Sequence, residues 1–151
     1  VDEEKRKHAA SMKEQFMTEG NKWVMLRHNS RLNSRRRRMA AIGTRYEQQK
    51  KEPYLLTDVH AVRIGDIAFA TTRFELYMDY MHRIQARSPF IQTFVIQLAG
   101  APNGSYLATK RAVEAKGYSA SMFCNMVSAD GGHQWVENQL AIMNKMKAKD
   151  E

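Results

Sequence analysis

The chain has 151 residues, of which 43% are hydrophobic, and it carries a formal net charge of +8. That length and apolar content allow one domain with a buried core, and the one cysteine, Cys124, excludes an internal disulfide. Every apolar run falls short of the roughly 18 residues that a membrane-spanning helix needs, and the charged opening Val1–Lys7 is unlike a signal or transit peptide. Because the sequence lacks an initiator methionine, we expect a processed product, an expressed portion or the C-terminal part of a longer protein.

The positive charge is concentrated in the first third of the chain. Residues 1–51 contain 14 lysines and arginines against 6 acidic residues, whereas residues 52–151 contain 10 of each. Such an asymmetry raises nucleic acid or an anionic surface as a partner. Its peak, Arg35–Arg38, lies in a predicted helix, where successive residues advance about 100° and therefore spread over every face. Since no helix-turn-helix, zinc-finger or RNP motif accompanies these arginines, the pattern favours a solvated or carboxylate-pairing helix over nucleic-acid binding.

The first third is predicted to be helical, and the middle of the chain is predicted to contain strands. Composition and apolar spacing indicate helices over about 3–18 and 21–50, with a break at Gly20-Asn21. After Pro53 the pattern changes to a period of two. Two β-rich runs on either side of Gly65-Asp66 predict a hairpin.

A helix and a strand are expected after the hairpin. Thr71-Thr72 is predicted to cap a helix over 74–87, which Ser88-Pro89 closes. Residues 91–98 form the next predicted strand. The almost continuous apolar character of this strand indicates a central place in its sheet.

Residues 98–118 are predicted to connect that strand to a short helix. A loop rich in glycine, proline, asparagine and serine leads to Tyr106. Thr109 is the expected N-cap of the helix, and Gly117 is its expected left-handed C-cap residue. A connection of this kind is where α/β proteins often place functional groups, and it is also an ordinary link between a strand and a helix.

The last part of the chain completes the expected fold. Residues 118–127 are predicted to be extended or irregular, and Gly131-Gly132 to lead into a final amphipathic helix. Together the elements predict a mixed α/β (α+β) fold with long N-terminal helices, a hairpin and a further strand in a mixed sheet, and helices packed on that sheet. We expect a single domain or part of a larger one, with a basic helical segment over 1–51 and an α/β segment over 58–148.

Few residues indicate chemistry by themselves. Glu75 has two interpretations: a first-turn carboxylate favoured by the helix dipole, or a metal ligand or acid–base group at the end of a strand. The five histidines lack the short spacing of a helix-borne zinc pair, and the sequence has no HExxH or CxxC motif, nucleophile elbow or phosphate loop. Cys124 has no signature around it.

Four stretches, taken in their order and spacing, resemble the C-terminal part of the catalytic domain of the neutral/alkaline (non-lysosomal) ceramidase family. They are Val62–Phe69, Phe74–Leu76, Gly104–Thr109 and Gly117-Tyr118. In that family an isoleucine-glycine strand leads to a glutamate, and an apolar strand leads to a tyrosine before a threonine-containing helix start. A second tyrosine lies twelve residues after the first, as Tyr118 does here. The resemblance covers about residues 58–146.

The resemblance implies a zinc amidohydrolase that cleaves the amide of an N-acyl sphingosine or a related lipid or amide substrate. By position, Glu75 and Tyr106 resemble the glutamate and tyrosine zinc ligands of the family, and Tyr118 resembles its catalytic tyrosine beside the reacting carbonyl. The two histidine ligands of the family come from far upstream, and nothing in this chain matches their motifs. We therefore expect a shared zinc site, completed by the remainder of the catalytic domain or by a partner chain, and no activity of this chain alone. Family members are often secreted or membrane-associated.

The alternative hypothesis is a non-catalytic basic module that binds nucleic acid or an anionic lipid surface through the helices around Arg35–Arg38. The zinc-site hypothesis makes a geometric demand, because a helix roughly 10 Å long separates Tyr106 from Tyr118. The two tyrosines can face one metal only if the chain after Gly117 folds back toward the loop.

Overall fold

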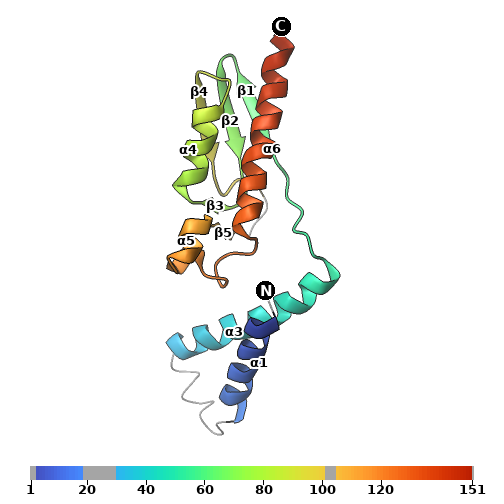
Figure 1. The fold of residues 1–151 in the computed structure, drawn as a ribbon, viewed down its shortest axis with the longest axis vertical. Coiled ribbons are helices and arrows are strands. Elements are labelled where there is room, and N and C mark those ends of the chain that lie inside the picture. Colours follow the sequence, from blue (N-terminus) through green and yellow to red (C-terminus); the bar gives the residue numbers. More distant parts are fainter. Residues whose placement is uncertain (1–2, 19–29, 101–104, 151) are drawn as a thin grey trace. The chain divides into compact units, whose positions relative to one another are not determined.

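The chain divides into two units, residues 1–55 and 56–151, and the described residues of the first unit are mainly helical (Figure 1). Helices α1 (Glu3–Thr18) and α3 (Ser30–Lys51) pack against each other. Ala9 on α1 and Ile42 on α3 are buried, and the hydroxyl of Tyr46 donates a hydrogen bond from α3 to Glu3 on α1.

The computed structural model describes residues 3–18, 30–100 and 105–150. Within these ranges the predicted first helix is confirmed, and the predicted second helix is confirmed from Ser30 onward. The predicted break at Gly20-Asn21 lies outside the described residues. No helix within the described ranges has the length and apolar character needed to cross a bilayer.

The second unit is built on a three-stranded sheet that begins with the predicted hairpin. Strands β1 (Ala61–Ile64) and β2 (Ile67–Thr71) pair in antiparallel fashion, with Ile64 opposite Ile67 across the turn. Gly65 in this turn has a φ of 59°, a left-handed conformation that glycine adopts without steric cost. The hairpin prediction is therefore confirmed.

Strand β4 (Gln92–Ile96) joins the sheet parallel to β2, which gives the order β1-β2-β4. The strand predicted over 91–98 is therefore present, but its predicted central place is wrong, because β2 is central and β4 is at an edge. The apolar run over residues 91–98 predicts a strand with both faces covered. In the structure Phe94 and Ile96 lie exposed on one face of the sheet.

Helices α4 (Met78–Arg87) and α6 (Ala129–Lys147) lie side by side and cover the other face of the sheet (Figure 1). They approach most closely at Gly132, where a Cβ atom would stand 2.2 Å from the hydroxyl oxygen of Tyr80. That hydroxyl is buried and donates to the carbonyl oxygens of Ala108 at 2.9 Å and Ala129 at 3.3 Å. The core between helices and sheet contains Ala68, Ala70, Phe74, Ile84, Phe90, Leu107, Trp135, Val136, Leu140 and Met143.

Two predicted helix starts are wrong. The helix expected from residue 74 begins at Met78, because Glu75–Leu76 pairs as a short strand, β3. The oxygen Oγ1 of Thr72 accepts a hydrogen bond from Phe74 N and so shapes the bend before β3 instead of capping α4. Helix α6 begins at Ala129, so that Gly131-Gly132 lies in its first turn and permits the contact with Tyr80.

Strands β3 and β5 (Tyr106–Leu107) form a second, two-stranded sheet, with α5 (Lys110–Glu114) and η2 (Tyr118–Ala120) following β5 in the chain. Strand β5 pairs in parallel with β3, so Tyr106 lies in a strand rather than in the predicted loop. Helix α5 begins as predicted, with Thr109 Oγ1 accepting from Ala112 N at 3.3 Å. The 3₁₀ turns η2 and η3 (Ala148–Asp150) precede and follow α6. The mixed α/β class is confirmed.

Candidate functional site

The short strands β3 and β5 bring Glu75 and Tyr106 together. The two residues are directly opposite each other in the parallel register, and side chains opposite each other in paired strands lie on the same face within contact distance. Both residues are half-buried. The fold therefore places side by side the two residues that resemble the zinc ligands of the ceramidase family.

Hydrogen bonds from its backbone N–H groups to backbone and side-chain oxygens hold β3 at the carboxyl ends of β2 and β4. Glu75 N donates to Ser105 O at 3.1 Å on the β5 side, and Leu76 N donates to the side-chain oxygen of Gln97 at 2.8 Å on the other side. Just beyond β2, Ala99 N donates to Thr72 O at 2.9 Å. The carboxyl edge of parallel strands is where α/β proteins most often bind ligands.

The negative charge of Glu75 is the main reason that the pKa of Tyr106 is raised above its usual value. Burial raises this pKa further, and Tyr118 and Cys124 add smaller contributions in the same direction. Tyr106 is opposite Glu75 in the strand register, its backbone N–H donates to the carbonyl oxygen of Cys124, and Tyr118 begins the turn η2 that contacts β5. We call Glu75, Tyr106, Tyr118 and Cys124 the β3–β5 site.

The segment after α5 folds back to β5, as the two-tyrosine geometry demands. Turn η2 contacts β5, and Tyr106 N donates to the carbonyl oxygen of Cys124 at 2.9 Å. The predicted role of Gly117 is wrong: its φ is −60°, and the residue before it, Lys116, has the left-handed φ of 56°. Tyr118 begins η2 with 65% of its surface exposed, so its phenol remains accessible beside the site.

Asn125 holds the segment after α5, residues 118–125, against β5 by hydrogen bonds. We call residues 118–125 the returning segment. The side chain of Asn125 is buried and accepts a hydrogen bond from Ala108 N at 3.0 Å, and its amide nitrogen donates to the carbonyl oxygens of Ser119 at 2.5 Å and Ser121 at 3.0 Å. The hydroxyl of Ser119 also shares a hydrogen bond with the Tyr77 hydroxyl at 2.7 Å. These bonds set the place of Tyr118, which directly precedes Ser119.

Cys124 and Asn125 are members of the site region that sequence reasoning missed. No nucleophile motif surrounds Cys124 in the sequence, and no sequence pattern marks Asn125 as a residue of the site. Their roles depend on Tyr106 N bonding to the backbone of the returning segment, a contact across 18 residues. No local pattern in the sequence signals that pairing.

The β3–β5 site contains side chains of the kinds that zinc accepts, but too few of them to hold the ion by themselves. Carboxylate oxygen and cysteine sulfur are ordinary zinc ligands, and the phenol of Tyr106 becomes a further oxygen donor when a cation favours its deprotonation. Within the described ranges, no three histidine, cysteine, aspartate or glutamate side chains lie close enough together to hold a metal ion. The donor set therefore fits zinc only with ligands from elsewhere.

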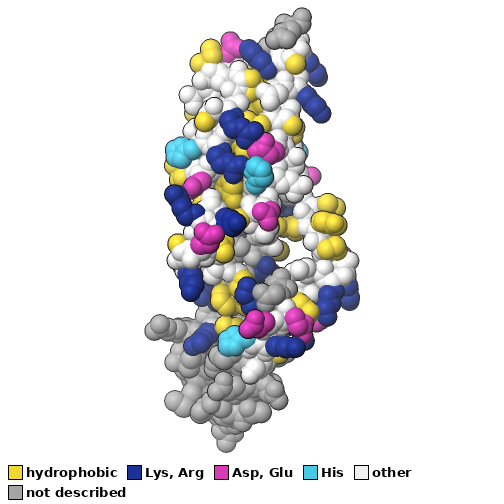
Figure 2. Space-filling model, viewed as in Figure 1, with side chains coloured by type: hydrophobic (Ala, Val, Ile, Leu, Met, Phe, Trp, Pro, Cys, Tyr) yellow, Lys and Arg dark blue, Asp and Glu magenta, His cyan; other side chains and the backbone are white. Residues whose placement is uncertain are grey.

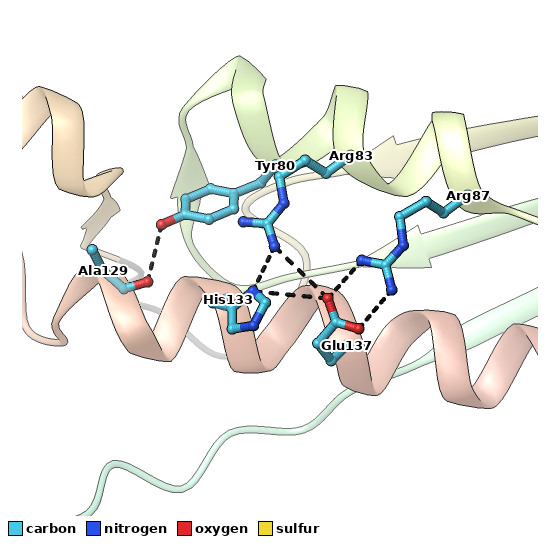
Figure 3. A network of polar contacts seen from close by, with 6 residues as sticks. All are labelled: Tyr80, Arg83, Arg87, Ala129, His133 and Glu137. Carbon is cyan, nitrogen blue, oxygen red and sulfur yellow. Dashed lines mark hydrogen bonds and ion pairs between the residues drawn. The ribbon is translucent and has the colours of Figure 1, made fainter.

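A second polar cluster joins α4 to α6 and has a different character (Figure 3). Arg87 binds both carboxylate oxygens of Glu137 at 2.6 and 2.7 Å. Arg83 lies 3.7 Å from the same carboxylate and 2.5 Å from His133 Nδ1. We call Arg83, Arg87, His133 and Glu137 the α4–α6 brace. Figure 2 shows basic and acidic side chains interspersed over these helices, as on an ordinary solvated surface.

Comparisons of the chain with family models, with curated proteins and with solved structures gave no match. The assignment of a function therefore depends on the geometry and chemistry of the β3–β5 site.

Proposed function

We propose that this chain is the C-terminal segment of a ceramidase-like, zinc-dependent amidohydrolase and that it contributes Glu75, Tyr106 and Tyr118 to a shared site. The observation that carries the proposal is the pairing of Glu75 with Tyr106 across β3 and β5, with Tyr118 on a segment that returns to the same place. Three residues nominated by a sequence resemblance gather at one point although they are far apart along the chain. A chance resemblance would not require that.

Each of the three side chains has a distinct task in this proposal. Glu75 and Tyr106 hold the metal through oxygen, and Glu75 keeps the phenol of Tyr106 protonated until a cation offsets its charge. Zinc, when bound, supplies a Lewis acid for the amide carbonyl and lowers the pKa of a bound water. The exposed Tyr118 hydroxyl donates a hydrogen bond to the developing oxyanion.

The remaining ligands come from outside this chain. Two histidines of the remainder of the catalytic domain, or of a partner chain, complete the coordination, and the substrate is an N-acyl sphingosine or a related lipid amide. Because a catalytic zinc site uses three protein ligands or more, this chain alone has neither stable catalytic zinc nor amidase activity.

Metal content and amidase activity of the protein that contains this segment test the proposal together. Glu75→Ala and Tyr106→Phe are expected to lower bound zinc and to abolish most of the hydrolysis of an N-acyl sphingosine. Glu114→Ala, which removes an exposed carboxylate on α5, is the matched control and should change neither. Unchanged zinc content and activity in both site variants would refute the ligand assignment.

We propose as the second candidate a basic module that binds nucleic acid or an anionic lipid surface. The supporting observation is that Arg35, Arg37 and Arg38 are exposed on α3, in a unit separate from the sheet. Affinity for a duplex or for anionic vesicles should then fall steeply as salt rises. Replacing these three arginines with glutamate should abolish the binding. An affinity that does not depend on salt would refute this second candidate.

A further inference from the structure

The sheet of the second unit has one apolar face that the described residues of this unit leave open. Val62, Phe69 and Phe94 form a row across the three strands, and the rings of Phe69 and Phe94 stack with centroids 5.3 Å apart. Ile64 and Ile67 flank this row at one end, and Ile96 extends it at the other. We call these six side chains the open face.

Strand alternation explains why the open face exists. Ala68, Ala70 and Thr93 point to the opposite side and are buried beneath the helices, so their neighbours in sequence must point away from the helices. Five of the six side chains are exposed, from 39% for Ile67 to 66% for Ile64, and Phe69 is partly buried between its neighbours. Scattered exposed apolar residues are normal on a protein, whereas these are neighbours on one face of three paired strands.

The chemistry of the open face determines what can cover it. The strand positions on this side hold only Thr71 and Gln92 besides the six apolar residues, and none is acidic or basic. A highly charged partner, such as nucleic acid, would lose its hydration there without gaining an ion pair. The suitable occupant is another flat, uncharged, apolar surface.

We propose that the open face is the interface of a homodimer in which a second copy of this chain packs sheet against sheet. An uncharged apolar surface is complementary to itself, which is what a two-fold interface requires. The second unit is nearly neutral, with 10 basic against 9 acidic residues over 56–151, so two such units do not repel each other. This inference is independent of the proposed hydrolase function.

The size of the open face is compatible with this role. The largest apolar patch on an ordinary monomer covers roughly 300–600 Å² and is often a functional surface. A stable interface takes about 800 Å² from each partner, so the open face can supply the apolar centre of such an interface and its surroundings must supply the remainder. Sheets packed in this way lie about 10 Å apart with aligned strands, which gives a helix–sheet–sheet–helix arrangement.

Sedimentation velocity of the chain over a concentration series tests the proposal. The parent is expected to sediment as a dimer. Phe94→Lys should raise the dissociation constant at least about tenfold, because an ammonium group would be buried without a partner. Val113→Lys is the control, since Val113 on α5 is 48% exposed and Phe94 is 46% exposed.

Two further measurements keep the outcome unambiguous. Circular dichroism establishes that each variant is folded, and Ile64→Lys, at the most exposed position of the open face, replaces Phe94→Lys if that variant unfolds. Raising the salt concentration should preserve or strengthen the dimer, because it screens the positive charge of residues 1–51. A parent that is monomeric at every concentration, or a Val113→Lys variant that dissociates as readily as Phe94→Lys, overturns the proposal.

Discussion

The α4–α6 brace and the β3–β5 site each place a carboxylate among ionisable neighbours, with opposite electrostatic results. In the brace, hydrogen bonds from Arg87 lower the pKa of Glu137, and the charges of Arg87, His133 and Arg83 lower it further. In the site, Glu75 raises the pKa of Tyr106, and Tyr118 and Cys124 add to that rise. In the brace two arginines surround one carboxylate, whereas in the site a carboxylate lies beside a tyrosine whose ionisation it disfavours.

This difference distinguishes a structural cluster from the site that we propose to be functional. Matched charges at a solvated helix surface add a little stability and need no ligand. A carboxylate beside a phenol and a thiol gains most from a cation, which would lower the pKa of each neighbour and bind all of them. Perturbed pKa values are frequent at functional sites, and structural ion pairs perturb them as well. The following substitutions separate the two regions experimentally, from the largest expected effect to the smallest.

Gly132→Ala should have the largest effect, because it acts where α6 packs on α4. The added Cβ would stand 2.2 Å from Tyr80 Oη and 2.3 Å from Cζ, and the buried ring can yield only by losing its bonds to Ala108 and Ala129. We expect the free energy of unfolding to fall by about 3 kcal/mol. Gly131→Ala is the control, since its Cβ would meet Val127 at an ordinary 3.4 Å and should change stability by less than about 1 kcal/mol. Equal denaturation midpoints for the two variants would contradict the packing described here.

Asn125→Ala should cost less stability but should disturb the β3–β5 site selectively. It removes three hydrogen bonds and leaves Ala108 N, buried at the end of β5, without its partner, a loss of about 1–3 kcal/mol. Hydrogen exchange should become faster around Tyr118 and Ser119 while the amides of α4 and α6 keep their protection. Asn138→Ala, at an exposed position of α6, is the matched control. Uniformly faster exchange would show that Asn125 supports the whole unit and not the returning segment.

The sequence was sufficient to predict the elements whose pattern is local. The hairpin around Gly65-Asp66, the first helix and the Thr109 cap depend on neighbouring residues and were predicted correctly. Strand β3 was not predicted, because a strand of two residues is too short to show an alternating pattern. Without knowledge of its partner strand β5, Glu75 is equally consistent with a carboxylate in the first turn of a helix. The position of β4 in the sheet was also wrong, since an apolar run does not tell which faces are covered.

The β3–β5 site was only partly predictable, for the same physical reason. Glu75, Tyr106 and Tyr118 were nominated from a resemblance, and their proximity depends on pairings over long sequence separations. The place of Cys124 in the site could not be predicted, because no sequence motif surrounds this thiol and its position beside Tyr106 depends on the folded chain. Likewise, the left-handed turn was expected at glycine and occurs at Lys116, where the folded context outweighs local preference.

Glu75→Gln should change the titration of Tyr106 with little change in stability at neutral pH. Removing the carboxylate charge should lower the pKa of Tyr106 toward its usual value near 10. The raised pKa means that the fold disfavours the phenolate, so the parent loses stability as pH rises above the ordinary tyrosine value, and the variant should lose less. Tyrosinate absorbance of parent and variant, with Tyr106→Phe to identify the step and Glu114→Gln as the control, measures the shift. An unchanged titration of Tyr106 in Glu75→Gln would mean that the two groups do not interact.

Glu137→Gln should have the smallest effect and should reveal the opposite sign of pH dependence. The pKa of Glu137 is lowered by the hydrogen bonds from Arg87, so its ion pairs stabilise the fold above the ordinary carboxyl pKa and are lost as pH falls through the lowered value. The variant should therefore be slightly less stable than the parent at neutral pH and equal to it in acid, and added salt should reduce the difference. Thermal unfolding at several pH values, with zinc binding of the complete protein as the second readout, measures both effects. Since the brace connects only α4 and α6, Glu137→Gln should leave zinc binding unchanged. A loss of zinc in this variant would contradict the assignment of a structural role to the brace and of metal binding to the β3–β5 site.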